Sequence, residues 1–167
     1  MVTKRKIEKK LPLTASVEEG PYYKHGSPER RNIAGPGTPG MKLILDGRVL
    51  DEHAHTIGHA WLDFWQADGN GQYDNEGFNL RGHQYADHEG CYHLETVKPM
   101  GYDGRAAHLH VKVRATKNSP ILTTQLFFPW DDKNKTDSIF EPLTVVDVED
   151  IEDGQRANFD FVIQTEE

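Results

Sequence analysis

The chain has 167 residues, a single cysteine (Cys91) and a formal net charge of −8, from 27 Asp and Glu against 19 Lys and Arg. This length accommodates one domain with its own apolar core, while the lone cysteine excludes an internal disulfide or a cysteine-based zinc cluster and favours a reducing, cytoplasmic location. The acidic balance disfavours binding to nucleic acid or to an anionic membrane, and no stretch approaches the roughly 20 apolar residues of a membrane-spanning helix.

The N-terminal segment is basic, MVTKRKIEKK, and lacks the apolar core of a secretory signal. We therefore expect residues 1–19 to form a charged, solvated arm. Gly and Pro residues at 26–28 and 35–40 mark a loop rather than a second domain. The sequence thus predicts a single domain over residues 20–167.

Short apolar or alternating runs, separated by turn signals, follow from position 41 onward. The expected strands are residues 42–45, 61–65, 90–96, 108–114, 121–128 and 158–163. Such spacing favours an all-β sandwich of mostly antiparallel strands, with long loops and little helix. The best helix candidate is the acidic stretch Val148–Asp153, which Gly154 would end after about one turn.

The run at 108–114 carries the first candidate site. Successive side chains of a strand point to opposite faces, so His108 and His110 share one face while Leu109, Val111 and Val113 share the other. Two imidazoles on one face can bind a metal ion, with a carboxylate as third ligand for Fe(II) or zinc. The same alternation also fits a strand whose histidine face is simply solvated, so neighbouring residues must decide.

A second histidine group lies at His53, His55 and His59. It follows Asp51-Glu52, surrounds Gly58 and falls between two expected strands. This setting predicts a solvated loop and not a metal site.

Further motifs give the histidine pair a context. They are Phe64-Trp-Gln-Ala-Asp68, Gly71-Gln-Tyr73, Leu80-Arg-Gly82, Asp87-His-Glu-Gly-Cys-Tyr92, Thr96-Val-Lys-Pro99, Gly101-Tyr102, Arg105-Ala-Ala-His-Leu-His110 and Thr123-Thr-Gln125. In this order the chain resembles a short member of the intradiol ring-cleavage dioxygenases, the family of the catechol 1,2-, protocatechuate 3,4- and hydroxyquinol 1,2-dioxygenases. The resemblance extends from Gly20 to the run near Phe161.

The resemblance implies one Fe(III) per chain, held by Tyr73, Tyr102, His108 and His110. Hard Fe(III) suits anionic oxygen ligands, and a nearby trivalent charge keeps a phenol ionised. It also implies catalytic roles for Arg105, Gln125 and Tyr102: Arg105 faces the substrate as a cation, Gln125 lies nearby, and Tyr102 takes a catechol proton. The implied substrates are a catechol and O2, and the implied product is a cis,cis-muconate-type acid. On sequence alone, Gln125 is equally well read as a buried amide.

The sequence leaves the substrate pocket, the oligomeric state and the class of function undecided. Tyr22 and Tyr23 follow Gly20-Pro21 and either bind the substrate ring or pack against a strand end. Only Asp103-Gly104 and three further residues separate Tyr102 from His108, where many members of the resembled family have a longer insert. This short segment predicts that the wall of the expected site beside it is more open. Because only about twenty residues precede Gly20, we expect no counterpart of the N-terminal helical extension through which catechol 1,2-dioxygenases dimerise, and a homo-oligomer is one option among others. A non-enzymatic, transthyretin-like β-sandwich binding module is the alternative of a different class.

Overall fold

The computed structural model describes residues 9–166, which form nine strands and two short 3-10 turns. The strands are β1 Lys42–Leu50, β2 Trp61–Gln66, β3 Arg81–Tyr85, β4 Cys91–Val97, β5 His108–Arg114, β6 Leu122–Phe127, β7 Asp147–Ile151, β8 Gly154–Asn158 and β9 Phe161–Val162. The turns are η1 Asp132–Lys135 and η2 Pro142–Thr144. No helix within these residues has the length and apolar character needed to cross a membrane.

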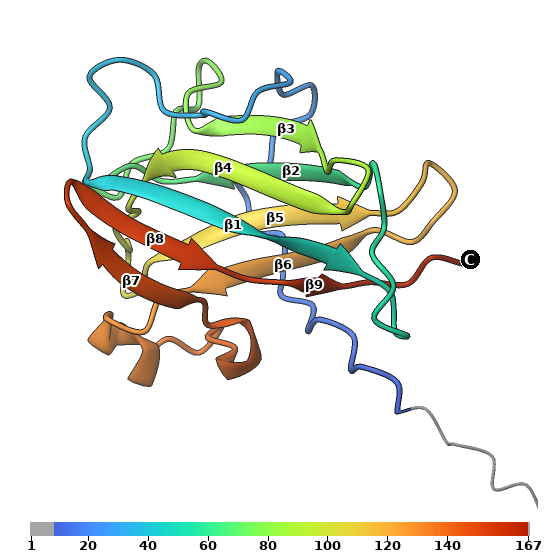
Figure 1. The fold of residues 1–167 in the computed structure, drawn as a ribbon. Helices are drawn as coiled ribbons and strands as arrows, with labels where there is room; N and C mark the ends of the chain where they lie inside the picture. Colours follow the sequence, from blue (N-terminus) through green and yellow to red (C-terminus); the bar gives the residue numbers. More distant parts are fainter. Residues whose placement is uncertain (1–8, 167) are drawn as a thin grey trace, which may run out of the picture.

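The strands form two sheets that lie one over the other (Figure 1). One sheet has the order β4-β1-β8-β7, with β9 beside β1, and the other has the order β3-β2-β5-β6. Only the β1–β8 and β1–β9 pairs are parallel, and every other named pair within the described chain is antiparallel. The predicted all-β sandwich is confirmed.

The core lies between the two sheets because the inward positions of the strands are apolar. Leu109, Val111 and Val113 of β5 are at most 1% exposed, and they meet Leu43 and Leu45 of β1 in one apolar cluster. Burying each such side chain contributes about 1.5–3 kcal/mol. The opposite positions of β5 therefore face away from the core, and the site is built on that outer face.

The helical turn predicted at Val148–Asp153 is wrong. Residues 147–151 form β7, which pairs antiparallel with β8 around a turn at 152–153. Acidic side chains on this edge strand stay in water and discourage pairing with another sheet. Gly154 does not end a helix but allows close strand contact, since a Cβ there would lie 2.2 Å from the Lys42 carbonyl oxygen.

Three strands, β3, β7 and β8, have no counterpart among the predicted strands, apart from Asn158 at the end of β8. The sequence of β3, Arg-Gly-His-Gln-Tyr, has no apolar alternation, because its buried residues are Arg81, Gly82 and Gln84. The run predicted at 158–163 is divided, with β8 ending at Asn158 and β9 starting at Phe161. Strand limits depend here on pairing with β1, which the local pattern does not encode.

The segment before the first strand crosses the outer face of the β3-β2-β5-β6 sheet, and we call residues 11–27 the N-terminal strap. The backbone N–H groups of Leu11, Thr14 and Val17 donate to the carbonyls of Glu52, Val162 and Thr123 at 2.7–3.0 Å. The described residues of the expected arm are thus held against the sandwich from Leu11 onward. Residues 1–8, with most of the basic cluster, lie outside the described residues.

Candidate metal-binding and catalytic site

Four donor atoms from three segments converge on the outer face of β5. His108 and His110 come from β5, Tyr73 from the loop between β2 and β3, and Tyr102 from the loop before β5. The Tyr73 oxygen lies 3.0 Å from the Tyr102 oxygen and 3.0 Å from His110 Nε2, and the Tyr102 oxygen lies 3.2 Å from His108 Nε2. Such separations suit donor atoms that share one ion at about 2 Å.

Both histidines are buried although they point away from the core. His108 is 2% and His110 1% exposed, because the strap and the loops of Tyr73 and Tyr102 cover this end of β5. Gly20 of the strap has φ +73°, a backbone conformation that favours glycine, and a Cβ there would lie 3.6 Å from His110 Cε1. The alternative prediction, that His108 and His110 lie on a solvent-exposed face of the strand, is wrong.

The surroundings keep both imidazoles neutral with Nε2 directed at the tyrosines. His108 Nδ1 donates to the Ala106 carbonyl at 2.7 Å, which leaves the lone pair on Nε2. Burial, aided by Arg105, lowers the pKa of His108 to about 4, and burial with His108 and Arg105 holds the pKa of His110 well below its usual value. A neutral imidazole with a free lone pair is the form that binds a metal ion.

The two tyrosines need a cation to ionise. Burial, followed by the nearby Tyr102, raises the pKa of Tyr73, and burial also raises the pKa of Tyr102. A trivalent ion between the two oxygens would offset this penalty and bind both as phenolates. Within residues 9–166 no site gathers three His, Cys, Asp or Glu side chains around a metal, so a His/carboxylate site at His108 and His110 finds no third ligand. The donor set fits a hard ferric ion.

Arg81 of β3 is a buried cation beside Tyr73 to which sequence reasoning gave no role. It is 3% exposed, its guanidinium carbon lies 5.9 Å from the Tyr73 ring centre, and its Nε donates to the Asp74 carbonyl at 3.0 Å. Its Nη1 donates to the Tyr22 carbonyl and so ties the strap to the site. The motif Leu80-Arg-Gly82 contains Arg81, but the sequence did not predict that its charge is buried, which only the structure shows.

Arg105 lies at the edge of the four donors and is held by two side chains. Its Nη2 donates to Gln125 Oε1 at 2.5 Å, and its Nε donates to Asp137 Oδ2 at 2.9 Å. Gln125 is fully buried and donates from Nε2 to the Glu18 carbonyl of the strap at 2.9 Å. The structure thus brings the predicted pair Arg105 and Gln125 into contact. It also places Asp137 against Arg105, a contact that the polar sequence 131–137 did not predict.

The two strap tyrosines occupy different surroundings. Tyr22 stacks on Tyr73 with ring centres 4.1 Å apart and meets Tyr102 edge-on at 5.8 Å. These three tyrosines line a cavity of about 380 Å³ together with Gly71, Gln72, Asn75 and Asp103. Tyr23 does not line it, since its hydroxyl donates to Asp63 at 2.8 Å and its ring packs on Trp65.

The other histidine group forms a solvated loop, as predicted. His53, His55 and His59 are exposed. The backbone N–H groups of His53 and His55 donate to Asp51 at 2.8 and 3.0 Å. Among the described residues, this loop holds no group of three or more His, Cys, Asp or Glu side chains that could bind a metal ion.

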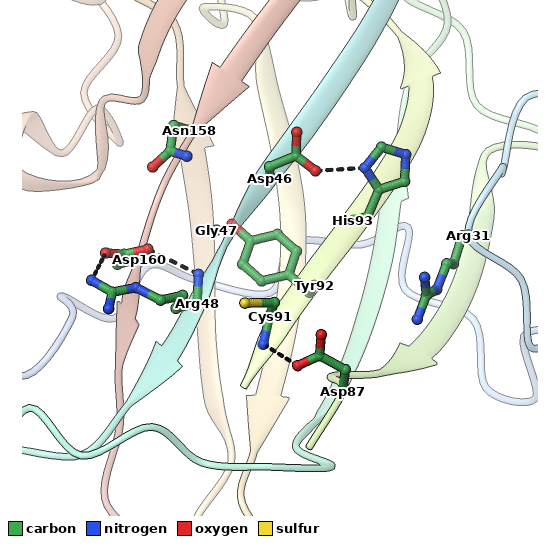
Figure 2. Close-up of a pocket in the computed structure, with 10 residues that line it drawn as sticks. All are labelled: Arg31, Asp46, Gly47, Arg48, Asp87, Cys91, Tyr92, His93, Asn158 and Asp160. Carbon is green, nitrogen blue, oxygen red and sulfur yellow. Dashed lines mark hydrogen bonds and ion pairs between the residues drawn. The ribbon is translucent and has the colours of Figure 1, made fainter. Parts of the chain in front are cut away.

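A larger cavity, of about 480 Å³, lies on the outer face of the other sheet (Figure 2). Figure 2 shows that its charged groups face one another: His93 Nδ1 lies 2.5 Å from Asp46, and Arg48 donates to Asp160 at 3.1 Å. Exposed pairs of this kind contribute little to stability and leave few free donors. The two tyrosine donors described above line the smaller cavity instead.

Comparison with protein families finds one described as "Dioxygenase", whose model matches residues 18–165. The hydroxyquinol 1,2-dioxygenase of Rhizobium sp. (strain MTP-10005) is 31% identical over 167 aligned residues, which cover 83% of this chain. The chain spans 56% of that relative's length. The catechol 1,2-dioxygenase 2 of Acinetobacter lwoffii is 32% identical over 71% of this chain and 54% of its own length.

Solved structures show the same relationship. The dioxygenase domain of a dioxygenase carbohydrate-binding protein fusion from Streptomyces sp. SirexAA-E has a TM-score of 0.88 and 40% identity, over 92% of this chain and 99% of that one. The 3-chlorocatechol 1,2-dioxygenase of Rhodococcus opacus 1CP has a TM-score of 0.83 and 26% identity, over 89% and 71%.

Proposed function

Because the chain belongs to the intradiol ring-cleavage dioxygenase family, we propose that it uses one ferric ion to insert both atoms of O2 into a catechol. The ring opens between the two hydroxylated carbons, and the product is a cis,cis-muconate-type acid. The observation that carries the proposal is the convergence of two phenol oxygens and two imidazole nitrogens at 3.0–3.2 Å with Arg105 beside them.

In this proposal Tyr73, Tyr102, His108 and His110 hold the iron. When bound, the ion supplies Lewis acidity that lowers the pKa of the catechol hydroxyls and makes the ring reactive toward O2. The phenolate oxygen of Tyr102 accepts a catechol proton, so the site needs no separate base. The guanidinium of Arg105 stabilises the negative charge that builds on the substrate, and Tyr22 forms one wall of the entrance.

The test is a visible spectrum of the purified protein, recorded during anaerobic titration with catechol, protocatechuate, hydroxyquinol and alkyl- or halocatechols. Ferric tyrosinate gives a strong visible charge-transfer band, and we expect at least one catechol to shift it and to be consumed when oxygen is admitted. A spectrum that no catechol perturbs would contradict the proposal. A colourless zinc protein would favour the His/carboxylate alternative, and a protein with neither metal nor activity the binding module.

Charge at the entrance predicts a preference among catechols. Asp103 is the one charged side chain among the described residues that line the cavity, and it is exposed. A carboxylate on the substrate ring would meet this charge at an interaction energy of about 1 kcal/mol or less in water. We expect Asp103→Asn to raise kcat/KM for protocatechuate about 2- to 5-fold, with catechol as the neutral control substrate. An equal change for both substrates would exclude a charge effect.

The proposal places the enzyme in the cytoplasm, where the free Cys91 stays reduced. Its partners are then a catecholic small molecule and O2. A homo-oligomer stays an expectation, to be measured by light scattering.

A further inference from the structure

The guanidinium of Arg105 is fixed from two directions. Gln125 accepts from Nη2 at 2.5 Å and Asp137 accepts from Nε at 2.9 Å. Arg105 lies three residues before His108 and five before His110. Among residues 9–166 no hydrogen bond engages Nη1, and the Arg105 side chain is 15% exposed.

Asp137 is unusually well buried for a carboxylate, with a side chain only 1% exposed. Besides Arg105, it accepts from the Ala106 backbone N–H at 2.9 Å and from the Ile139 N–H at 2.8 Å. Burial alone would raise the pKa of Asp137, but the hydrogen bonds from Arg105, Ile139 and Ala106 lower it below its usual value. The carboxylate is thus charged and cannot move without losing several partners.

Asp131 holds the same loop in place as Asp137 does, so its substitution measures the effect of losing a purely structural contact. Asp131 accepts from the N–H of Ala107, the residue after Ala106, at 2.8 Å and from the N–H of Lys133 at 2.9 Å. Both aspartates therefore tie the same loop to the segment that leads into β5. Only Asp137 also touches Arg105.

We propose that Asp137 is a positioning residue that, with Gln125, sets the direction in which Arg105 meets the substrate. The inference rests on the proposed ring-cleavage function. An arginine side chain has many rotamers, and fixing two of its N–H groups removes most of that freedom before the substrate arrives. A misplacement of about 1 Å in such a group can cost about 100-fold in rate.

The test is a double-mutant cycle on the iron-loaded enzyme. We expect Asp137→Asn to lower kcat about 10- to 100-fold, with KM, iron content and visible spectrum nearly unchanged. Asp131→Asn is the matched control and should leave kcat within about 3-fold. In an Arg105→Ala background, Asp137→Asn should lower kcat less than about 2-fold, because the group it positions is gone.

Two results would overturn the inference alone: an unchanged kcat in Asp137→Asn, or an equal loss with and without Arg105. If Asp137→Asn does not fold, Asp137→Glu takes its place in the same cycle, since it keeps the charge while displacing the guanidinium. An iron-free, inactive wild-type protein would instead contradict the proposed function and this inference with it. Melting temperatures of the metal-free variants separate a folding defect from a catalytic one.

Discussion

Replacing Tyr73 with phenylalanine is expected to lower kcat/KM by about 10³-fold or more and to weaken or abolish the visible band. The change removes one of the two oxygen donors of the proposed site, together with the negative charge that Fe(III) favours in a ligand. The ring itself stays in place, because it stacks on Tyr22 at 4.1 Å. We therefore expect the free energy of unfolding of the metal-free protein to change by only about 1 kcal/mol.

The measurements are iron per chain by elemental analysis, the visible spectrum and steady-state oxygen uptake. Tyr85→Phe is the matched control, because Tyr85 is 48% exposed on β3 and lies outside the donor cluster. It should keep full iron content and activity. A Tyr73→Phe protein with stoichiometric iron and wild-type turnover would remove Tyr73 from the ligand set.

Replacing Arg105 with alanine is expected to separate catalysis from metal binding. No donor atom is lost, so iron content should stay close to one per chain. The substrate charge would lose its fixed cation, which corresponds to a fall in kcat/KM of about 10²- to 10³-fold, or roughly 3–4 kcal/mol. Asp137 would also lose its partner in a buried ion pair, so some loss of thermal stability should accompany the change.

Arg114→Ala provides the control for this prediction. Arg114 lies at the other end of β5, where it stacks on Trp61 at 4.7 Å. Its removal takes the same charge from the far end of the strand that Arg105 precedes, and it should leave kcat/KM within about 2-fold. If both arginine variants lose activity equally, general electrostatics rather than the position of Arg105 would be responsible.

Much of the fold could be read from the residues because the inward strand positions carry a strong alternating signal. Leu109, Val111 and Val113 predicted both the strand at 108–114 and the direction of His108 and His110. The same rule failed at β3, whose polar residues show no alternation, and at β7, where acidic residues suggested a helical turn. Pairing with neighbouring strands decided both, and a local pattern does not contain that information.

For the candidate site, too, the sequence predicted one part and only the structure revealed the other. The sequence by itself determined the types and order of the proposed donors, since the tyrosines, the His-x-His pair, Arg105 and Gln125 stand in motifs that resemble those of the family. Only the tertiary structure decided that His108 and His110 are buried, because the strap that covers them lies more than 80 residues away along the chain. It also decided the surroundings of Arg81 and Asp137, since both side chains are buried and bind partners distant in sequence. Burial converts ordinary charged residues into fixed ones, and burial is a property of the folded chain.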